Sequence, residues 1–399
     1  MAGSGDDGSA SSRDDSGPGV REVVAEVGRG VAGPDVDLVI GLGARHPSTN
    51  GTIRLALRLS GDRVVAAEPV VGFLHRGAEK LFEVRDYRQI LSLANRHDWL
   101  SSYGSELSVC LAVERMMGIE VPPRTVWLRT LLAELTRVLH HLHFLGSAPV
   151  GEATERVIGP LSADLREQIQ RLLEELTGGR VHFMVNRIGG LGVDTPTGWP
   201  ARTAACVDAL RVGLDSLHAA LQADDEMPGR TADVGRLSAG QALSYGASGP
   251  VARACGVDLD LRRDEPYLAY AELADVLRVV TRTAGDSAAR FACLLEQCQV
   301  SLDLVTACLG RLPGGPVAVR LPKVVRPPEG QTYAWVENPA GLAGVLLVSH
   351  GEKTPWRLAL RTASYANVQT LPALLVGAAV EEIPAVLASL FFTVGDIDK

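Results

Sequence analysis

Three short segments contain most of the side chains that could exchange protons or bind an aromatic ring. They are the loop 41–51, the loop 72–77 and the sequence 96–99, which together contain His46, Asn50, His75, Arg76, Arg96, His97, Asp98 and Trp99. An imidazole titrates near neutral pH, whereas an arginine stays charged and donates several hydrogen bonds. Glycine gives both loops backbone freedom, and loops on a rigid support are where chemistry usually occurs. We therefore expect the chemistry of this chain in these segments.

Alternating apolar residues predict the support that positions the two loops. Residues 52–59 and 64–71 have apolar side chains at about every second position, and Ser60-Gly61-Asp62 separates the two runs. This pattern is typical of a half-buried β-hairpin. The sequence therefore predicts a hairpin with one of the two loops at each end.

Other candidate sites have weaker support. Of the clustered residues His140, His141 and His143, the first and last share a helix face, but no carboxylate lies at a matching offset and no His-Glu-x-x-His sequence occurs, so structural or interface roles are favoured. The pair Gly41-x-Gly43 is followed by Pro47, which prevents the helix that a dinucleotide loop requires. No metal or nucleotide site is predicted.

The cysteines also argue against a metal site or a disulfide framework. None falls in a Cys-x-x-Cys pair: Cys110, Cys206, Cys255, Cys293, Cys298 and Cys308. Buried free thiols in a reducing compartment are the favoured interpretation.

Composition excludes several broad classes of function. A net charge of -8 argues against nucleic acid as the main partner. The longest strongly apolar run, 371–380, falls short of the roughly 20 residues that a membrane-spanning helix needs. No charged-then-apolar signal segment opens the chain, so secretion is not expected.

Hydrophobic periodicity predicts a mixed fold. Strand character at 36–72 and 331–361 surrounds several long helical patterns, of which 124–145 has a wide apolar stripe. The predicted helices are 79–94, 98–117, 124–145, 162–176, 201–222 and 269–309, the last interrupted near Gly285. The fold class is therefore α+β, with a central antiparallel helical bundle flanked by small β-sheets. Residues 1–35, rich in Gly, Ser and Asp, are predicted to form a disordered tail.

An ordered series of short segments resembles the D subunit of respiratory complex I, the proton-pumping NADH:quinone oxidoreductase. The matching segments run from about Gly41 to the C-terminus: His46-Pro47-x-x-x-Gly51, Gly72-x-Leu74-His75-Arg76-Gly77-x-Glu79-Lys80, Leu111-Ala112-Val113-Glu114, Gly118-Ile119-Glu120-Val121-Pro122-Pro123-Arg124, Arg187-x-Gly189-Gly190, Gly246-x-Ser248-Gly249-Pro250, Asp258-x-Asp260-Leu261-Arg262-x-Asp264-x-Pro266-Tyr267, Pro339-x-Gly341, Leu347-Val348-Ser349 and Gly395-Asp396-Ile397-Asp398-Lys399.

The resemblance implies the fold of the large subunit of nickel-iron hydrogenases. It also implies one domain over 36–399, made of an N-terminal hairpin region (36–75), the helical bundle (76–310) and a C-terminal α+β region (311–399). Hydrogenases bind nickel and iron through two Cys-x-x-Cys pairs, and the corresponding segments here, 96–99 and 395–399, contain no cysteine. Hydrogenase activity is therefore excluded, since soft thiolates are the ligands that such a centre needs.

The same resemblance implies a function and its partners. The chain would be a subunit of a proton-translocating NADH:quinone oxidoreductase, peripheral on the cytoplasmic side of the cell membrane. It would help form the quinone-reduction chamber beside the terminal iron–sulfur cluster of the complex I B subunit, and contact the C subunit and the membrane subunit at the quinone entrance. Quinone would be the substrate. The chain itself would bind no cofactor, because NADH, FMN and the iron–sulfur clusters belong to partner subunits.

The resemblance also implies which residues form the site, by their positions in the matching segments. His46, Asn50 and Trp99 occupy the places of quinone-binding residues in the family, while Arg76, Arg96 and His182 match residues near the partner's cluster. An arginine facing a reducible cluster stabilises its reduced state, and a histidine there can couple protonation to electron transfer.

Two of these positions depart from the family. Its members have His where this chain has Asn50 and Tyr where it has Trp99. An amide and an indole donate hydrogen bonds but do not release protons, so protons for quinol formation would come from His46, His75, His97 or water. The family's Asp just beyond the helix 124–145 is also absent here. These departures indicate a diverged paralogue, and leave a second hypothesis open: an assembly or structural paralogue that has lost quinone reduction.

Overall fold

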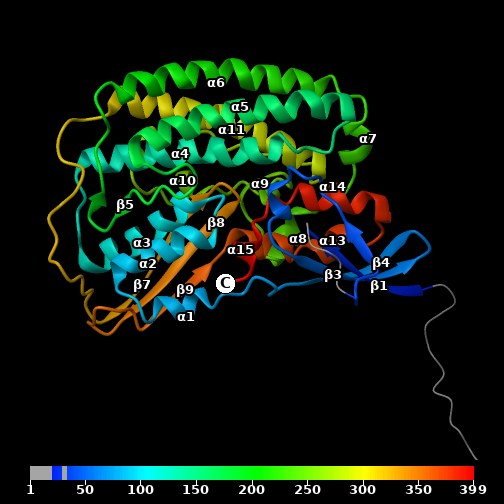
Figure 1. Ribbon diagram of the computed structural model, residues 1–399, viewed down its shortest axis with the longest axis horizontal. Helices are drawn as coiled ribbons and strands as arrows, with labels where there is room; N and C mark the ends of the chain where they lie inside the picture. The colour runs from blue at the N-terminus through cyan, green and yellow to red at the C-terminus, as the bar shows by residue number, and fades with distance from the viewer. Residues whose placement is uncertain (1–19, 29–33) are drawn as a thin grey trace, which may run out of the picture.

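The computed structural model describes residues 20–28 and 34–399. Figure 1 shows a layer of long helices lying over a region of strands and shorter helices, with a second sheet at one side. The C-terminus lies in the middle of the molecule, where these parts meet. The predicted α+β class, with a helical bundle and small sheets, is confirmed.

The long helices form a four-helix bundle. It consists of α4 (Pro123–Leu145), α5 (Glu152–Thr177), α6 (Trp199–Gln222) and α11 (Ser287–Arg311). Each helix packs against two neighbours around the ring α4, α5, α6, α11, and their apolar stripes make one large core. The bundle therefore gives the chain a rigid body against which the loops can be fixed.

The N-terminal sheet has the strand order β2-β1-β3-β4. Its strands are β1 (Val20–Val27), β2 (Leu38–Ile40), β3 (Ile53–Ser60) and β4 (Arg63–Val70). The predicted hairpin is β3–β4, closed by Gly61 and Asp62 between the paired residues Ser60 and Arg63. The short helix η1 (Pro47–Thr49) precedes β3. This sheet therefore carries the first of the predicted site loops.

A second sheet is packed against helices from the first half of the chain. The antiparallel strands β7 (Gly330–Asn338), β8 (Gly341–Ser349) and β9 (Arg357–Arg361) share a core with α1 (Ala78–Phe82), α2 (Tyr87–His97) and α3 (Ser102–Met117). Besides this core, α2 contacts α15 and β5, which connects it to the C-terminal segment.

Short elements complete the described chain. They are β5 (Asn186–Arg187), β6 (Gly190–Leu191), α7 (Met227–Thr231), α8 (Ala239–Ser244), α9 (Gly249–Arg253), α10 (Leu261–Asp264), η2 (Ala271–Leu273), α12 (Ala363–Val368), α13 (Leu371–Leu375), η3 (Val380–Glu382), α14 (Ile383–Ala388) and α15 (Val394–Ile397).

The prediction of a disordered tail over 1–35 is wrong for residues 20–27. They form β1, which pairs with β3 along its whole length and buries Val23, Ala25 and Val27. Pairing with a strand far along the chain stabilises a segment whose own composition is only moderately apolar. Residues 28, 34 and 35 are also described, whereas residues 1–19 and 29–33 lie outside the described residues.

Two predicted helices are also corrected. The helix 79–94 is two helices, because Asp86 caps α2 through the backbone N–H groups of Arg88 and Gln89. The predicted helix 269–309 is helical only from Ser287 on, apart from the single turn η2. The segment before it buries Leu273 and Val280 in the bundle core, and Arg278 and Arg282 form partly exposed ion pairs with Glu296 on α11.

One described helix, α11, is long and apolar enough to cross a membrane by length and composition. It lies against α4 and α6, and its buried residues belong to the bundle core. Its apolar character is therefore that of a core helix.

Candidate functional site

The short C-terminal helix α15 is where two of the predicted site segments meet. Trp99 packs so closely on Gly395 that a methyl group added to this glycine would overlap the indole ring. Gly51, the neighbour of Asn50, lies against Val394, whose Cβ is 2.7 Å from the place of an added methyl group. Since Val394 and Gly395 are consecutive, the loop before β3 and the residue after α2 are brought to one place in the fold.

The second site loop is anchored to the same C-terminal segment. The Asp398 carboxylate accepts hydrogen bonds from the N–H groups of Gly72 and Leu74, each at 2.7 Å. The Lys399 ammonium donates to the carbonyl oxygen of Leu360 at 2.8 Å. The end of the chain is thus packed into the molecule and fixes the loop that carries Arg76.

Arg76 reaches across to the end of α2. Its guanidinium donates long hydrogen bonds to the carbonyl oxygens of Arg96, His97 and Gly395 at 3.4, 3.5 and 3.5 Å. The same group lies 5.9 Å from the centre of the Trp99 ring, within range of a cation–π interaction. These contacts are weak, and Arg76 is exposed.

Arg96 and His182 lie on the other side of the α2 end. Arg96 is exposed, and its guanidinium is 3.7 Å from the sulfur of Met184. The His182 Nδ1 donates to Asn95 Oδ1 at 2.6 Å, while the Asn95 amide group donates to the buried Glu106 carboxylate. Partial burial, and then the nearby Arg96 charge, lower the pKa of His182. The neutral imidazole is therefore favoured at the surface beside Arg96.

His46 differs from the other candidates because it is fully buried. Its Nε2 donates to the carbonyl oxygen of Ala388 at 3.3 Å, and its Nδ1 accepts from the N–H of Ser48 at 3.3 Å. The ring also makes an edge contact with Phe144, with 5.5 Å between ring centres. Burial lowers the pKa of His46 to about 4. His46 is therefore neutral at neutral pH, and its hydrogen bonds stabilise the loop 41–51.

Asn50 is exposed at the end of η1. Its side-chain amide donates to the carbonyl oxygen of Pro47 at 3.3 Å, which leaves its carbonyl oxygen available to a ligand. A hollow of about 210 Å³ lies on the inner side of the same loop and is lined by His46 and Arg230, but not by Asn50 or Trp99. His46 and Asn50 therefore face different spaces.

A buried acidic group lies directly behind Trp99. His97 is 3.7 Å from an Asp396 oxygen, and Asp98 accepts from the N–H groups of Leu100 and Ser101, each at 3.2 Å. Burial, and then the Asp396 charge, raise the pKa of Asp98 to about 7, and burial raises the pKa of Asp396. Burial also lowers the pKa of His97 to about 4. The sequence indicates His97 as a proton source and shows Asp98 next to it, but it gives no sign that Asp396 lies beside them.

Comparison with known proteins identifies the family. The family model described as "Respiratory-chain NADH dehydrogenase, 49 Kd subunit" matches residues 158–329 and 322–399. The NADH-quinone oxidoreductase D subunit 1 of Streptomyces coelicolor is 57% identical over 378 residues, covering 94% of this chain and 98% of that protein. The D subunit 2 of Salinispora tropica is 57% identical over 384 residues, covering 95% and 98%. The D subunit of Geobacillus kaustophilus is 37% identical over 368 residues, covering 91% and 98%.

The chain belongs to the D-subunit family of NADH-quinone oxidoreductase. It is thus a component of complex I, and the function that the resemblance implies at this level is confirmed.

In this D subunit the family segments pack against one another in the fold. Gly249 lies so close to the turn between β7 and β8 that an added methyl group would be 2.5 Å from the carbonyl oxygen of Ala340. The Ser248 hydroxyl accepts from the N–H of Leu342 at 3.0 Å, and Asn367 donates to Ala340 at 3.1 Å. The segment 246–250 and the turn 339–341, which are separate matches in the sequence, are therefore packed against each other in the fold.

A buried network of charges joins α4 of the bundle to α9, α10 and β7, and sequence reasoning missed it. Glu134 on α4 pairs with Arg262 at 3.0 Å, Arg262 pairs with Asp260 at 2.7 Å, and Arg253 pairs with Glu337 at 2.7 Å. The Arg262 and Arg253 charges help to lower the pKa of Asp260 against the effect of burial. Charged residues inside the apolar stripe of the helix 124–145 were the available signal.

The other candidates of the sequence analysis have structural surroundings. His141 Nε2 is 3.0 Å from the Gln297 side chain, and burial lowers the pKa of His140 and His141 well below the usual value. All six cysteines are free thiols. Within residues 20–28 and 34–399, no group of three or more His, Cys, Asp or Glu side chains is arranged to hold a metal ion.

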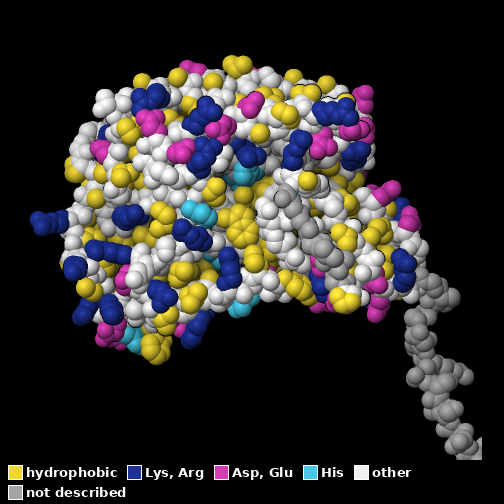
Figure 2. All heavy atoms as spheres, in the orientation of Figure 1, with side chains coloured by type: hydrophobic (Ala, Val, Ile, Leu, Met, Phe, Trp, Pro, Cys, Tyr) yellow, Lys and Arg dark blue, Asp and Glu magenta, His cyan; other side chains and the backbone are white. Residues whose placement is uncertain are grey.

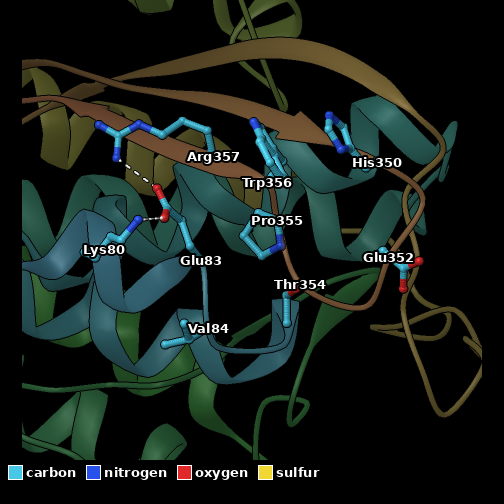
Figure 3. A pocket seen from close by; sticks show the side chains of 9 residues that line it. All are labelled: Lys80, Glu83, Val84, His350, Glu352, Thr354, Pro355, Trp356 and Arg357. Atoms are coloured by element: carbon cyan, nitrogen blue, oxygen red, sulfur yellow. Dashed lines mark hydrogen bonds and ion pairs between the residues drawn. The ribbon is translucent and has the colours of Figure 1, made fainter.

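A broad hollow of about 700 Å³ is lined by none of the candidate site residues described above. Figure 3 shows it between α1 and the turn after β8, with Glu83 bridging Lys80 and Arg357. Trp356 is 65% exposed and stacks on His350, with 4.4 Å between ring centres. None of the predicted quinone or cluster residues lines it.

One face of the molecule has the appearance of a contact surface. Figure 2 shows hydrophobic side chains gathered in the middle of this face, with Lys and Arg side chains beside them. Exposed apolar area of this kind on a component of a larger complex is typical of an interface.

Proposed function

We propose that this D subunit forms one wall of the quinone-reduction chamber of its complex, next to an iron–sulfur cluster of the B subunit. Trp99 and Asn50 would face the quinone, with His46 supporting the Asn50 loop from inside. Arg76, which the family resemblance groups with the cluster residues, is reassigned to the quinone because its guanidinium lies near the Trp99 ring. Arg96 and His182 would face the cluster. The C subunit and the membrane subunit at the quinone entrance are the further partners in this proposal. The complex would operate on the cytoplasmic side of the cell membrane and couple quinone reduction to proton translocation.

One observation carries the proposal: the Asn50 loop, Trp99 and Arg76 all contact the consecutive residues Val394 and Gly395. Segments far apart in the sequence thus converge on a single turn of the chain. A flat indole, an amide oxygen and a guanidinium are suited to hold a quinone ring and its carbonyl oxygens. The exposure of Asn50 and Arg76 in the single chain is what a chamber completed by a second subunit requires.

The geometry also determines what these residues can do chemically. Reduction of a quinone to a quinol takes two electrons and two protons. Asn50 and Trp99 can orient the ring through hydrogen bonds and stacking, but neither donates a proton. His46 is neutral, buried and hydrogen-bonded through both ring nitrogens, so it is not a proton donor. The proton must therefore come from another group or from water.

Substitution of the two departing positions tests the proposal. In the assembled complex, Asn50→His with Trp99→Tyr should change the Michaelis constant for quinone and the rate of its reduction by NADH. Reduction of a soluble artificial acceptor that takes electrons before the quinone should stay constant. His218→Gln, on the exposed face of α6, is a matched control. Identical quinone kinetics in the double variant and the control would contradict the proposed site.

The alternative is an assembly or structural paralogue without quinone turnover. The absence of an acid at both Asn50 and Trp99 favours it. Purification of the complex through this chain distinguishes the two functions. An intact complex that oxidises NADH with the artificial acceptor but never with quinone would establish the alternative.

A further inference from the structure

A small cavity lies between α2, α3, β8 and β9, next to the Asp396 end of the chain. It has a volume of about 20 Å³ and is lined by His97, Asp396, Arg361, Thr362, Ser105 and Ser108, together with apolar groups. A space of roughly 10 to 15 Å³ is enough for one water molecule, provided that several polar partners surround it. The cavity is therefore large enough and polar enough to hold a water.

Unpartnered polar atoms line this cavity. Both ring nitrogens of His97 and the hydroxyl of Thr362 are buried without a hydrogen-bond partner among the described residues. At least one His97 nitrogen carries a hydrogen in any tautomer. The Asp396 oxygen that faces it is 3.7 Å away, too far for a direct hydrogen bond and suited to a bridging water.

We propose that His97, Asp98 and Asp396, together with a water in this cavity, form a buried proton-exchange site of the protein. Resting on the proposed function, we further propose that this site supplies one of the two protons of quinone reduction. His46 is not assigned such a role, because both of its ring nitrogens are already hydrogen-bonded.

The charges around the site favour a shared proton. Asp98 and Asp396 are both buried, and each carboxylate raises the cost of ionising the other. The remaining charged groups that face the site are the cations Arg76, Lys399 and Arg361 and the acid Glu79. Burial favours neutral forms, so Asp98 with a pKa of about 7 can gain and lose a proton near neutral pH beside a His97 that stays neutral.

The position fits delivery toward the quinone. Asp98 immediately precedes Trp99 in the sequence. The Trp99 ring packs on Gly395, and Asp396 is the next residue. Both carboxylates therefore neighbour the indole that is proposed to face the quinone. In the step proposed, two electrons that originate from NADH enter the quinone. One proton leaves the Asp98 carboxyl for a quinone oxygen, the second comes from solvent, and the resulting carboxylate is reprotonated through His97 and the cavity water.

Infrared difference spectroscopy on the purified complex tests the proton site independently of quinone. The wild type should show the carbonyl band of a protonated carboxylic acid that disappears as the pH rises through neutrality. Asp98→Asn should lack this band, and His97→Gln should shift its midpoint. The new amide oxygen at position 98 can still accept from Leu100 and Ser101, so folding should be retained. A band unchanged in Asp98→Asn, or no such band in the wild type, would overturn the proton site.

Turnover tests the delivery step. Quinone reduction by the wild type should fall as the pH rises through about 7, because the donor becomes deprotonated. Asp98→Asn should lower kcat about tenfold or more and flatten this pH profile, while the artificial-acceptor rate stays constant. His218→Gln should match the wild type. Identical pH profiles in all forms would overturn delivery. If the wild-type complex reduces no quinone, delivery fails with the proposed function, and the infrared result alone decides the proton site.

Discussion

The bundle and the end of α2 both contain many charged groups, but they use them in opposite ways. In the bundle Glu134 is satisfied by Arg262, Tyr270 and Ser301, at 3.0, 2.5 and 2.7 Å. At the end of α2, Arg76 makes only long contacts, and the His97 nitrogens have no partner in the described part of the chain. Saturated charges hold a fold together, whereas unsaturated ones are free to act on a ligand, a proton or a neighbouring protein.

The largest effect should follow from breaking the saturated network. Arg262→Met leaves the Asp260 carboxylate with the more distant Arg253, 3.4 Å away, and removes one partner of Glu134. Removal of one member of a buried charge pair costs roughly 3–5 kcal/mol. Denaturant unfolding of the purified protein should show this loss. Arg171→Ala, which breaks an exposed ion pair with Glu167, should leave the unfolding midpoint unchanged.

The next effect concerns the contact beneath Trp99. Gly395→Ala places a methyl group into the indole ring and the His97 carbonyl, so the ring or the C-terminal helix must move. Such overpacking costs about 1–3 kcal/mol. Gly310→Ala, where an added methyl group would meet no described atom within 4 Å, is the control and should be neutral or slightly stabilising. Equal stability of the two variants would contradict the packing described here.

The stability of the fold should depend on pH through the burial of His46. The folded-state pKa of His46 is about 4, below the ordinary value of 6.5, so the unfolded chain binds the proton more readily. The stability that neutral His46 contributes is present above pH 6.5 and is lost as the pH falls to about 4, by roughly 3 kcal/mol. His46→Gln should flatten this part of the stability profile. A profile as steep as the wild type would show that His46 is not the group responsible.

The smallest effect on stability should come from the exposed arginine. Arg76→Gln removes long hydrogen bonds and a distant cation–π contact, which together contribute no more than about 1 kcal/mol. Quinone reduction by the complex should nevertheless fall severalfold. Arg88→Gln, which also contacts backbone carbonyl oxygens but lies away from the site, is the matched control. If Arg76→Gln unfolded the protein enough to account for the fall in quinone reduction, a functional role of Arg76 would be contradicted.

Local patterns predicted the parts of the fold that local energetics determine. The hairpin β3–β4 follows from alternation and a two-residue turn, and α4 follows from its proline start and apolar stripe. The strand β1 could not be predicted, because its partner β3 lies far along the sequence. The segment before α11 has apolar residues at helical spacing, but Leu273 and Val280 pack into the bundle core in another conformation, which depends on tertiary contacts.

The sequence nominated the members of the candidate site, whose roles stay predictions, but it could not give their arrangement. Motif positions indicated Trp99, Arg76, Arg96 and His182, and these do lie around one helix end. The sequence could not show that His46 is sealed behind Ala388, nor that Asp396 returns from the far end of the chain to face His97. Such contacts depend on tertiary packing, which spacing alone does not encode.

A photoreactive quinone gives the most direct test of the proposed chamber. Irradiated with the active complex, a quinone with an azide near its head group should label peptides of this chain that contain Trp99 or Asn50, and excess unmodified quinone should suppress the labelling. Labelling that is confined to other subunits, in a complex that still reduces quinone, would contradict the account.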